Sequence, residues 1–168
     1  MTAEIRGLTL RHPWAWAFLH GKDVENRTWR PERMGGRVGM FLALHGGATK
    51  VNEEYAQEIQ ESMEWIISRC AHQAGVLTAK DFPEGGKVTL GDVLRPGIVA
   101  VGRLVEVRQD SPSPWAAAGQ WHWCLDVTPL PEPVPHRGAQ GLWTLEPEAL
   151  AKVREGYRAA RAGREVTA

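Results

Sequence analysis

Three charged side chains near the N-terminus are spaced so that they can meet a single ligand. Lys22, Glu25 and Arg27 lie within six positions of one another, shortly before Trp29. Residues 23–29 are predicted to form a β-strand, and alternation places Asp23, Glu25, Arg27 and Trp29 on one of its faces. In a partly buried site such charges must pair or be neutralised. Two interpretations follow: Glu25 pairs with Arg27 or Lys22 only to fix the strand, or the charges bind a ligand.

A planar ligand with an exocyclic amine suits the second interpretation. Glu25 can accept a hydrogen bond from an amine such as N4 of cytosine, and Asn26 can complete the contact with the base edge. The chain has eight tryptophans, against three phenylalanines and two tyrosines. Indole rings stack well on bases. We therefore predict a nucleobase-binding pocket lined by Trp14, Lys22, Glu25, Asn26, Arg27, Trp29, His45, Trp115 and Trp121.

Three further residues have two interpretations each. Trp115 lies in a predicted loop over residues 109–120, where it either covers the pocket as a lid or packs beneath the loop. Arg137 lies among prolines and glycines and is either solvated or in contact with phosphate. Trp65, on a predicted helix, is expected to pack.

Composition limits the kind of partner. Lysine and arginine together number 20, as do aspartate and glutamate, so the formal net charge is zero. A neutral chain has no broad basic field to hold a long polynucleotide, so we expect a local contact or a small ligand. The six histidines and the distant Cys70 and Cys124 do not have metal-ligand spacing, and no phosphate-binding glycine motif occurs. We predict no metal, no cofactor, no membrane span and a cytoplasmic location.

The elements that must position these residues alternate between strands and a few helices. Strands are predicted over residues 8–10, 23–29, 37–45, 98–107, 121–127 and 142–145. Helices are predicted over residues 14–20, 53–74 and 147–162, with a loop over residues 77–94. The prolines between residues 129 and 135 cannot donate to a ladder, so that piece is expected at an edge or in a loop. This pattern predicts an α+β fold with a mixed β-barrel, in a single domain over residues 1–168.

Several of these pieces resemble a known family. Residues 21–27 have the pattern GKxxExR and follow a short helix that begins with Pro13 and Trp14. The strand that ends at His45, the strand from Gly97, the run Trp121-His122-Trp123 and the run Gly141-Leu142-Trp143 follow in the corresponding order. Over about residues 6–146 the chain resembles the ASCH domain, a relative of the PUA, EVE and YTH folds. The resemblance implies a PUA-like barrel with a short N-terminal helix, a helical insertion over about residues 49–94 after the second barrel strand, and a C-terminal helix.

Three functions are open, and the resemblance implies the first two. The first is a module that binds RNA, or single-stranded or flipped modified bases, and it is our leading prediction. The second is a hydrolase. Small members of the family are acetylcytidine amidohydrolases that use a lysine, a threonine three residues on and a distant glutamate. Lys22 matches the lysine, but Glu25 stands at the threonine position, and Glu106 is a candidate for the distant glutamate.

Other members of the family are described as cutting single-stranded RNA without metal. Here His45, His122, Lys22 and Arg27 are the residues that could supply the acid, the base and the cation. In either enzyme Lys22 and Glu25 would be the catalytic pair. The third function is a protein–protein interaction module in which the charged cluster is purely structural.

Overall fold

The computed structural model describes residues 3–70 and 88–167. Its strands are β1 (Ile5–Leu10), β2 (Val24–Arg27), β3 (Phe41–Gly46), β4 (Gly97–Arg108), β5 (Trp121–Val134) and β6 (Leu142–Thr144). Its helices are α1 (Trp14–Phe18), α2 (Glu53–Cys70), α3 (Leu90–Val93) and α4 (Pro147–Thr167), with a 3₁₀ turn, η1 (Pro31–Met34). The predicted α+β class is confirmed.

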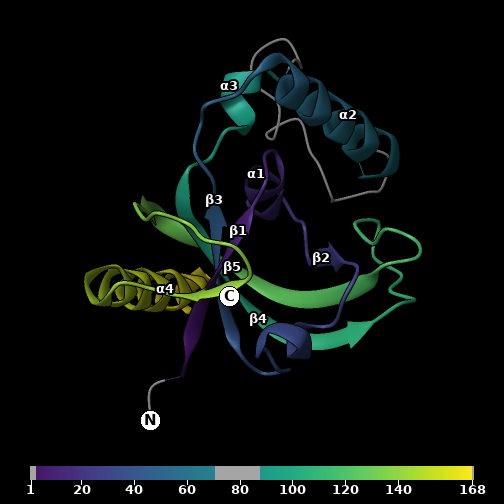
Figure 1. Cartoon of the computed structure of the whole chain (residues 1–168). Helices are drawn as coiled ribbons and strands as arrows, with labels where there is room; N and C mark the ends of the chain where they lie inside the picture. Colours follow the sequence, from purple (N-terminus) through teal and green to yellow (C-terminus); the bar gives the residue numbers. More distant parts are fainter. Residues whose placement is uncertain (1–2, 71–87, 168) are drawn as a thin grey trace.

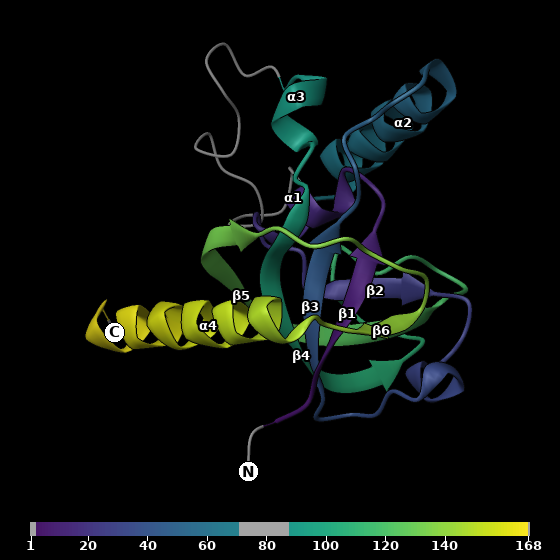
Figure 2. The same cartoon turned by 60° about the vertical axis from the view of Figure 1, so that its left-hand side comes forward.

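The six strands form one mixed sheet in the order β2-β5-β4-β3-β1-β6. β1 and β3 run parallel, and the other neighbours are antiparallel. The sheet curls into a half-barrel, and its edge strands β2 and β6 have four and three residues. The predicted barrel is therefore open between these edges in the described part of the chain. Figures 1 and 2 show α2 and α3 gathered near α1 at one end of the sheet, while α4 lies along β5.

Two strands have an end that differs from the prediction by four residues or more, whereas β1 begins three residues early and β2 is three residues shorter than predicted. β3 begins at Phe41 rather than Arg37, because Gly39 adopts a φ of +94° in a turn that only glycine accommodates easily. β5 continues through the prolines to Val134. β2 pairs with β5 only as far as Cys124, and from Pro129 onward β5 pairs with β4 alone. The prolines thus lie at a sheet edge, where a missing N–H costs no ladder bond.

The helices between β3 and β4 occupy the predicted insertion. α2 buries Ile59, Met63, Ile66 and Cys70, whereas Ile67 is exposed. The predicted end of this helix, residues 71–74, lies outside the described residues. Within the predicted loop a short helix, α3, forms after Thr89, whose side chain and that of Asp92 make a capping box. α4 reaches Thr167, five residues past the predicted end at 162.

Three apolar clusters hold these layers together. The first fills the inside of the curled sheet under α1 and contains Phe18 and Trp123. The second joins α2 to the outer side of β2 through Trp16, Val24 and Trp115. The third lies between the sheet and α4, with buried residues Ala43, Ile98, Val101, Leu130, Val134, Trp143, Leu145, Ala149 and Val153. Among the described residues no helix has the length and apolar character of a membrane span.

Candidate functional site

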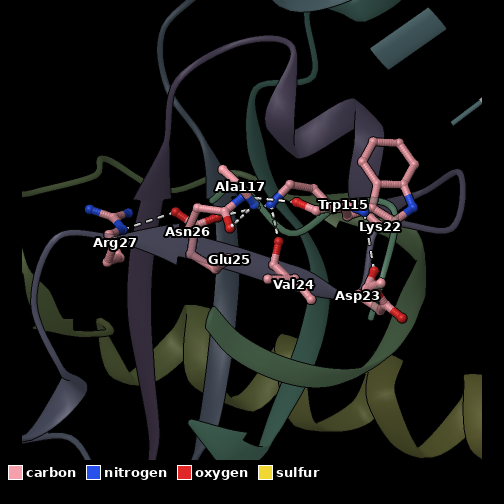
Figure 3. Close-up of polar contacts among 9 residues, drawn as sticks. Lys22, Asp23, Val24, Glu25, Asn26, Arg27, Trp115 and Ala117 are labelled. Atoms are coloured by element: carbon pink, nitrogen blue, oxygen red, sulfur yellow. Dashed lines mark hydrogen bonds and ion pairs between the residues drawn. The ribbon is translucent and has the colours of Figure 1, made fainter. Parts of the chain in front are cut away.

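Lys22, Glu25 and Arg27 form one continuous set of ion pairs (Figure 3). Lys22 Nζ donates to Glu25 Oε2 at 3.2 Å, and Arg27 Nε donates to Glu25 Oε1 at 2.9 Å. Lys22 Nζ also donates to the backbone carbonyl of Val24. The Glu25 carboxylate thus pairs with two cations. The predicted pairing of Glu25 with Lys22 or Arg27 is confirmed for both residues.

The local chain explains this convergence. α1 ends before Gly21, whose φ of +103° turns the chain sharply into β2. In the register of β2 on β5, Glu25 lies opposite Trp123 and Arg27 opposite Trp121. Directly opposed residues of an antiparallel pair share a face, so Glu25 and Arg27 point together toward the inside of the sheet.

Burial makes Lys22 unusual. Its residue is 3% exposed, and Nζ lies 4.2 Å from the ring centre of Phe18 and 5.4 Å from that of Trp14. Loss of solvation lowers the pKa of Lys22, and the charge and hydrogen bond of Glu25 oppose that shift only in part. An amine in this state gives up its proton more readily than a surface lysine.

A larger hollow of about 810 Å³ opens on one side of these ion pairs. Its chemically active lining comprises Arg11, Arg27, Trp29, His45, His136 and Arg137. None of the described residues that line it is an aspartate or a glutamate. Trp29 is half-buried and meets Trp123 edge-on at 5.4 Å between ring centres. The larger hollow therefore combines positive groups with part of an indole surface.

A smaller hollow of about 410 Å³ opens on the other side, between α2 and the loop before β5. Trp14 and Trp65 form a corner there, with ring centres 5.9 Å apart and planes at 77°. Its charged lining comprises Lys22, Glu25, Glu58 and Glu61. The expected single pocket is thus divided: Trp14, Lys22, Glu25 and Asn26 line the smaller hollow, whereas Arg27, Trp29 and His45 line the larger one.

Two ion pairs link the hollows. Arg11 and Arg27 line the larger hollow, and their partners Glu58 and Glu25 line the smaller one. Arg11 binds Glu58 with two hydrogen bonds of 2.7 and 2.6 Å, and its guanidinium lowers the pKa of Glu58. The guanidinium groups therefore belong to one lining and the carboxylates to the other, which gives the two hollows opposite charge.

The connection between β5 and β6 (residues 135–141), which we call the strap, lines the larger hollow. His45 Nε2 donates to the carbonyl of His136 at 2.7 Å, so Nδ1, 3.3 Å from Thr9 Oγ1, is left to accept from that hydroxyl. Burial lowers the pKa of His45 and favours this neutral form. His45 is therefore engaged in holding the strap.

Three predicted residues do not act as expected. Trp115 is 1% exposed and packs against α2, so its packing interpretation is met, and the expectation of a lid or stacking ring is wrong. Trp121 lines neither hollow among the described residues; it packs against the first cluster and lies under Arg30 at 4.9 Å. Asn26 lines the smaller hollow, but its amide bonds Trp115 O and Ala117 N, both at 2.9 Å, which leaves little capacity for a base edge (Figure 3).

Two of the residues suggested for hydrolysis, Glu106 and His122, lie away from both hollows. Glu106 is more than half exposed, pairs with Arg108 and lines neither hollow in the described chain. His122 is buried, and its two ring nitrogens contact Ser111 N at 3.1 Å and Ala117 O at 2.7 Å. Both histidine contacts anchor the loop that precedes β5.

No family model and no curated protein matches this chain. Within the described residues, no three histidine, cysteine or acidic side chains are grouped as metal ligands. The geometry and the sequence motif therefore carry the functional argument.

Several site residues were not predicted from the sequence. Arg11, Glu58 and Glu61 gave no local signal, because their roles depend on α2 lying beside the end of β1. Trp65, expected only to pack, also lines the smaller hollow. His136 is placed by Glu146, whose N–H donates to its Nε2 at 3.1 Å.

Proposed function

We propose that this protein is a nucleobase-binding module, a half-barrel of the PUA-like ASCH type, and that the base is held in the larger hollow. The observation that carries the proposal is the combination of Trp29 with three arginines in a hollow of about 810 Å³ that has no carboxylate among its described lining residues. That volume lies in the range of small-molecule sites. Positive charge favours nucleic acid over a neutral planar ligand.

The available contacts match a single base rather than a duplex. A base can stack on the accessible part of Trp29, and such stacking contributes roughly 1–3 kcal/mol. Arg27 Nε is used by Glu25, which fixes the guanidinium 5.6 Å from the Trp29 ring centre. The formal net charge of zero fits a contact limited to one or a few nucleotides of RNA or of a single-stranded or flipped modified base.

Matched tryptophan deletions test this proposal. Isothermal titration calorimetry with cytidine, its N-acetylated and N-methylated forms and short single-stranded RNA and DNA would identify ligands of the intact chain. We expect Trp29→Ala to weaken binding about tenfold or more and Trp14→Ala to change it less than twofold. The reverse result would move the base to the smaller hollow. Absence of binding to every ligand would favour the protein–protein interaction module.

A specific observation also favours a hydrolase as the second candidate. Lys22 has a lowered pKa and shares the smaller hollow with Glu25, Glu58 and Glu61. A neutral Lys22 can accept a proton from water as that water attacks the acetyl carbon of acetylcytidine. The protonated Lys22 then returns this proton to N4 as the C–N bond breaks, which releases cytidine and acetic acid. Glu25 stands where the family resemblance calls for a threonine, and the α2 glutamates supply carboxylates that Glu106 does not.

Product analysis separates this candidate from binding alone. Acetylcytidine and labelled single-stranded RNA would be incubated with the wild type, Lys22→Ala and Lys22→Arg, with and without a chelator. Turnover that is lost in both variants would support a role for a lysine that can become neutral, because arginine keeps its proton. Turnover unchanged in both variants would exclude Lys22 as the catalytic group.

A further inference from the structure

The three arginines of the larger hollow differ in their partners. Arg11 is bound by Glu58 and Arg27 by Glu25. Arg137 lies on the strap and is exposed, and within residues 3–70 and 88–167 its guanidinium has no hydrogen-bond or ion-pair partner. Of the three, Arg137 is therefore the one whose charge and donors are available to an incoming anion.

A phosphate group matches the chemistry that Arg137 offers. A guanidinium presents paired N–H donors that match two phosphate oxygens, and such charge-assisted bonds are stronger than neutral ones. No described carboxylate lines the larger hollow to compete with a phosphate for this cation. Building on the proposed function, we infer that Arg137 binds a phosphate of the ligand, so the hollow selects a nucleotide over a free nucleoside or base.

The strap holds the backbone at Arg137 in place. His136 precedes it, and the carbonyl of His136 accepts from His45 Nε2 at 2.7 Å. The His136 ring accepts from Glu146 N at Nε2, so its Nδ1 carries the proton and donates to Arg137 O at 2.6 Å. The same ring lies against Trp143, with centres 4.7 Å apart. Fixing this backbone before the ligand arrives reduces the entropy lost on binding.

Gly138 allows the strap to approach the sheet. A Cβ at this position would lie 2.4 Å from Thr9 Oγ1 and 2.7 Å from His45 Cε1. Any larger residue must therefore lift the strap or displace His45 from its contact with His136. Gly138 is thus a positioning residue, and its substitution would move Arg137 without removing its charge.

The inference is tested by separating the phosphate from the base. Calorimetry would compare cytidine, cytidine 5′-monophosphate, cytidine 3′-monophosphate and a cytidine trinucleotide with inorganic phosphate alone. The proteins are the wild type, Arg137→Gln, Gly138→Ala and, as a control from the same lining, Arg11→Gln. We expect at least one phosphorylated ligand to bind about 10- to 150-fold more tightly than cytidine, the range for hydrogen bonds to a charged group.

The variants should respond differently. Arg137→Gln should reduce the advantage of the phosphorylated ligand to within twofold of cytidine, with both affinities measured on the variant. Gly138→Ala should lose most of the same advantage, whereas Arg11→Gln should keep it. If the trinucleotide binds more tightly than both mononucleotides, the ligand is an internal nucleotide of a strand. If the trinucleotide and the better mononucleotide bind with equal affinity, the ligand is a mononucleotide.

Failure of the inference differs from failure of the proposed function. If cytidine binds and phosphate adds nothing, or if Arg137→Gln keeps the full advantage, the inference is overturned and base binding stands. If no nucleoside binds but inorganic phosphate binds and is lost in Arg137→Gln, the phosphate site stands without the base. If neither class of ligand binds, both are overturned.

Discussion

The two hollows are linked by the same ion pairs, yet those pairs give them opposite charge. The larger hollow is lined by the guanidinium members, Arg11 and Arg27, and the smaller hollow by the carboxylate members, Glu58 and Glu25. The larger one is bordered by strand ends and the strap, the smaller one by α2 and a loop. A charged cluster that is balanced in sequence can therefore give one hollow a positive lining and the other a mostly negative one.

The largest expected effect on stability comes from substituting Glu25, the carboxylate that Lys22 and Arg27 share. Glu25→Gln leaves Lys22 buried without an opposing charge, and we expect a loss of about 3–5 kcal/mol in the free energy of unfolding. Urea denaturation measures it. Glu58→Gln, at a half-exposed pair, is the control and should cost at most about 1 kcal/mol. The double variant Lys22→Met with Glu25→Gln should recover part of the loss. If Glu58→Gln destabilises the protein as much as Glu25→Gln does, a buried role for Glu25 is contradicted.

The next effect concerns the wall of the smaller hollow. Asn26→Ala removes the two hydrogen bonds that join β2 to Trp115 and Ala117. We expect a loss of about 1–3 kcal/mol, because buried backbone groups are left without partners. Denaturation and hydrogen exchange of the Ala117 amide measure it. Asp23→Ala, which removes the exposed side-chain contact with Ser113 and keeps the bond from Trp115 N to Ser113 Oγ, serves as the control, and rapid exchange at Ala117 should occur only in Asn26→Ala.

The hollows should respond to pH in different ranges. The folded pKa of His45 lies below 6.5, so below that pH the unfolded chain binds a proton that the native protein resists. Stability should therefore fall as pH drops from 7.5 toward the folded pKa, by at most about 1.4 kcal/mol per pH unit for this group. His45→Gln should flatten the acid slope measured by denaturation, and an unchanged slope would show that other groups cause it.

Lys22 gives the alkaline counterpart. Its folded pKa lies below 10.5, so the native state loses a proton before the unfolded chain does. Stability should rise as pH increases from the folded pKa toward 10.5, again by no more than about 1.4 kcal/mol per pH unit. Lys22→Met should lack this rise. Comparing it with the wild type by denaturation between pH 8 and 10 tests the effect.

The smallest expected effect on stability comes from breaking the exposed ion pair of Arg11 with Glu58. Arg11→Gln removes a surface ion pair with Glu58 and should cost about 0–1 kcal/mol at low salt. That cost should shrink further in 0.5 M salt, because exposed charges are screened. The cost of Glu25→Gln should persist in the same buffer. Similar salt dependence for both variants would contradict the difference in burial between the two pairs.

The strands and the charged cluster were largely predictable from local patterns. Alternation placed Glu25 and Arg27 on one face of β2, and β4 lies within one residue of its predicted bounds at each end. The predicted strand ends were wrong where a local pattern is compatible with two structures. The prolines of β5 permit either an edge strand or a loop, and only pairing with β4 decides that they belong to a strand. The sequence likewise left Trp115 as either a lid or a packed residue, and the apolar face of α2 decides for packing.

By itself, the sequence determined which residues share a face of one strand or one helix, because strands repeat every two residues and helices every three to four. Examples are Glu25 and Arg27 on β2 and the buried apolar face of α2. The sequence also placed Lys22 three positions before Glu25. Tertiary structure alone decided the contacts between distant segments. Arg11 meets Glu58 across 47 positions, Asn26 meets Trp115 across 89 and His45 meets His136 across 91. Such contacts depend on strand order and on which faces are buried together, and neither is encoded in local spacing. The division of one predicted pocket into two hollows of opposite charge is a consequence of these contacts.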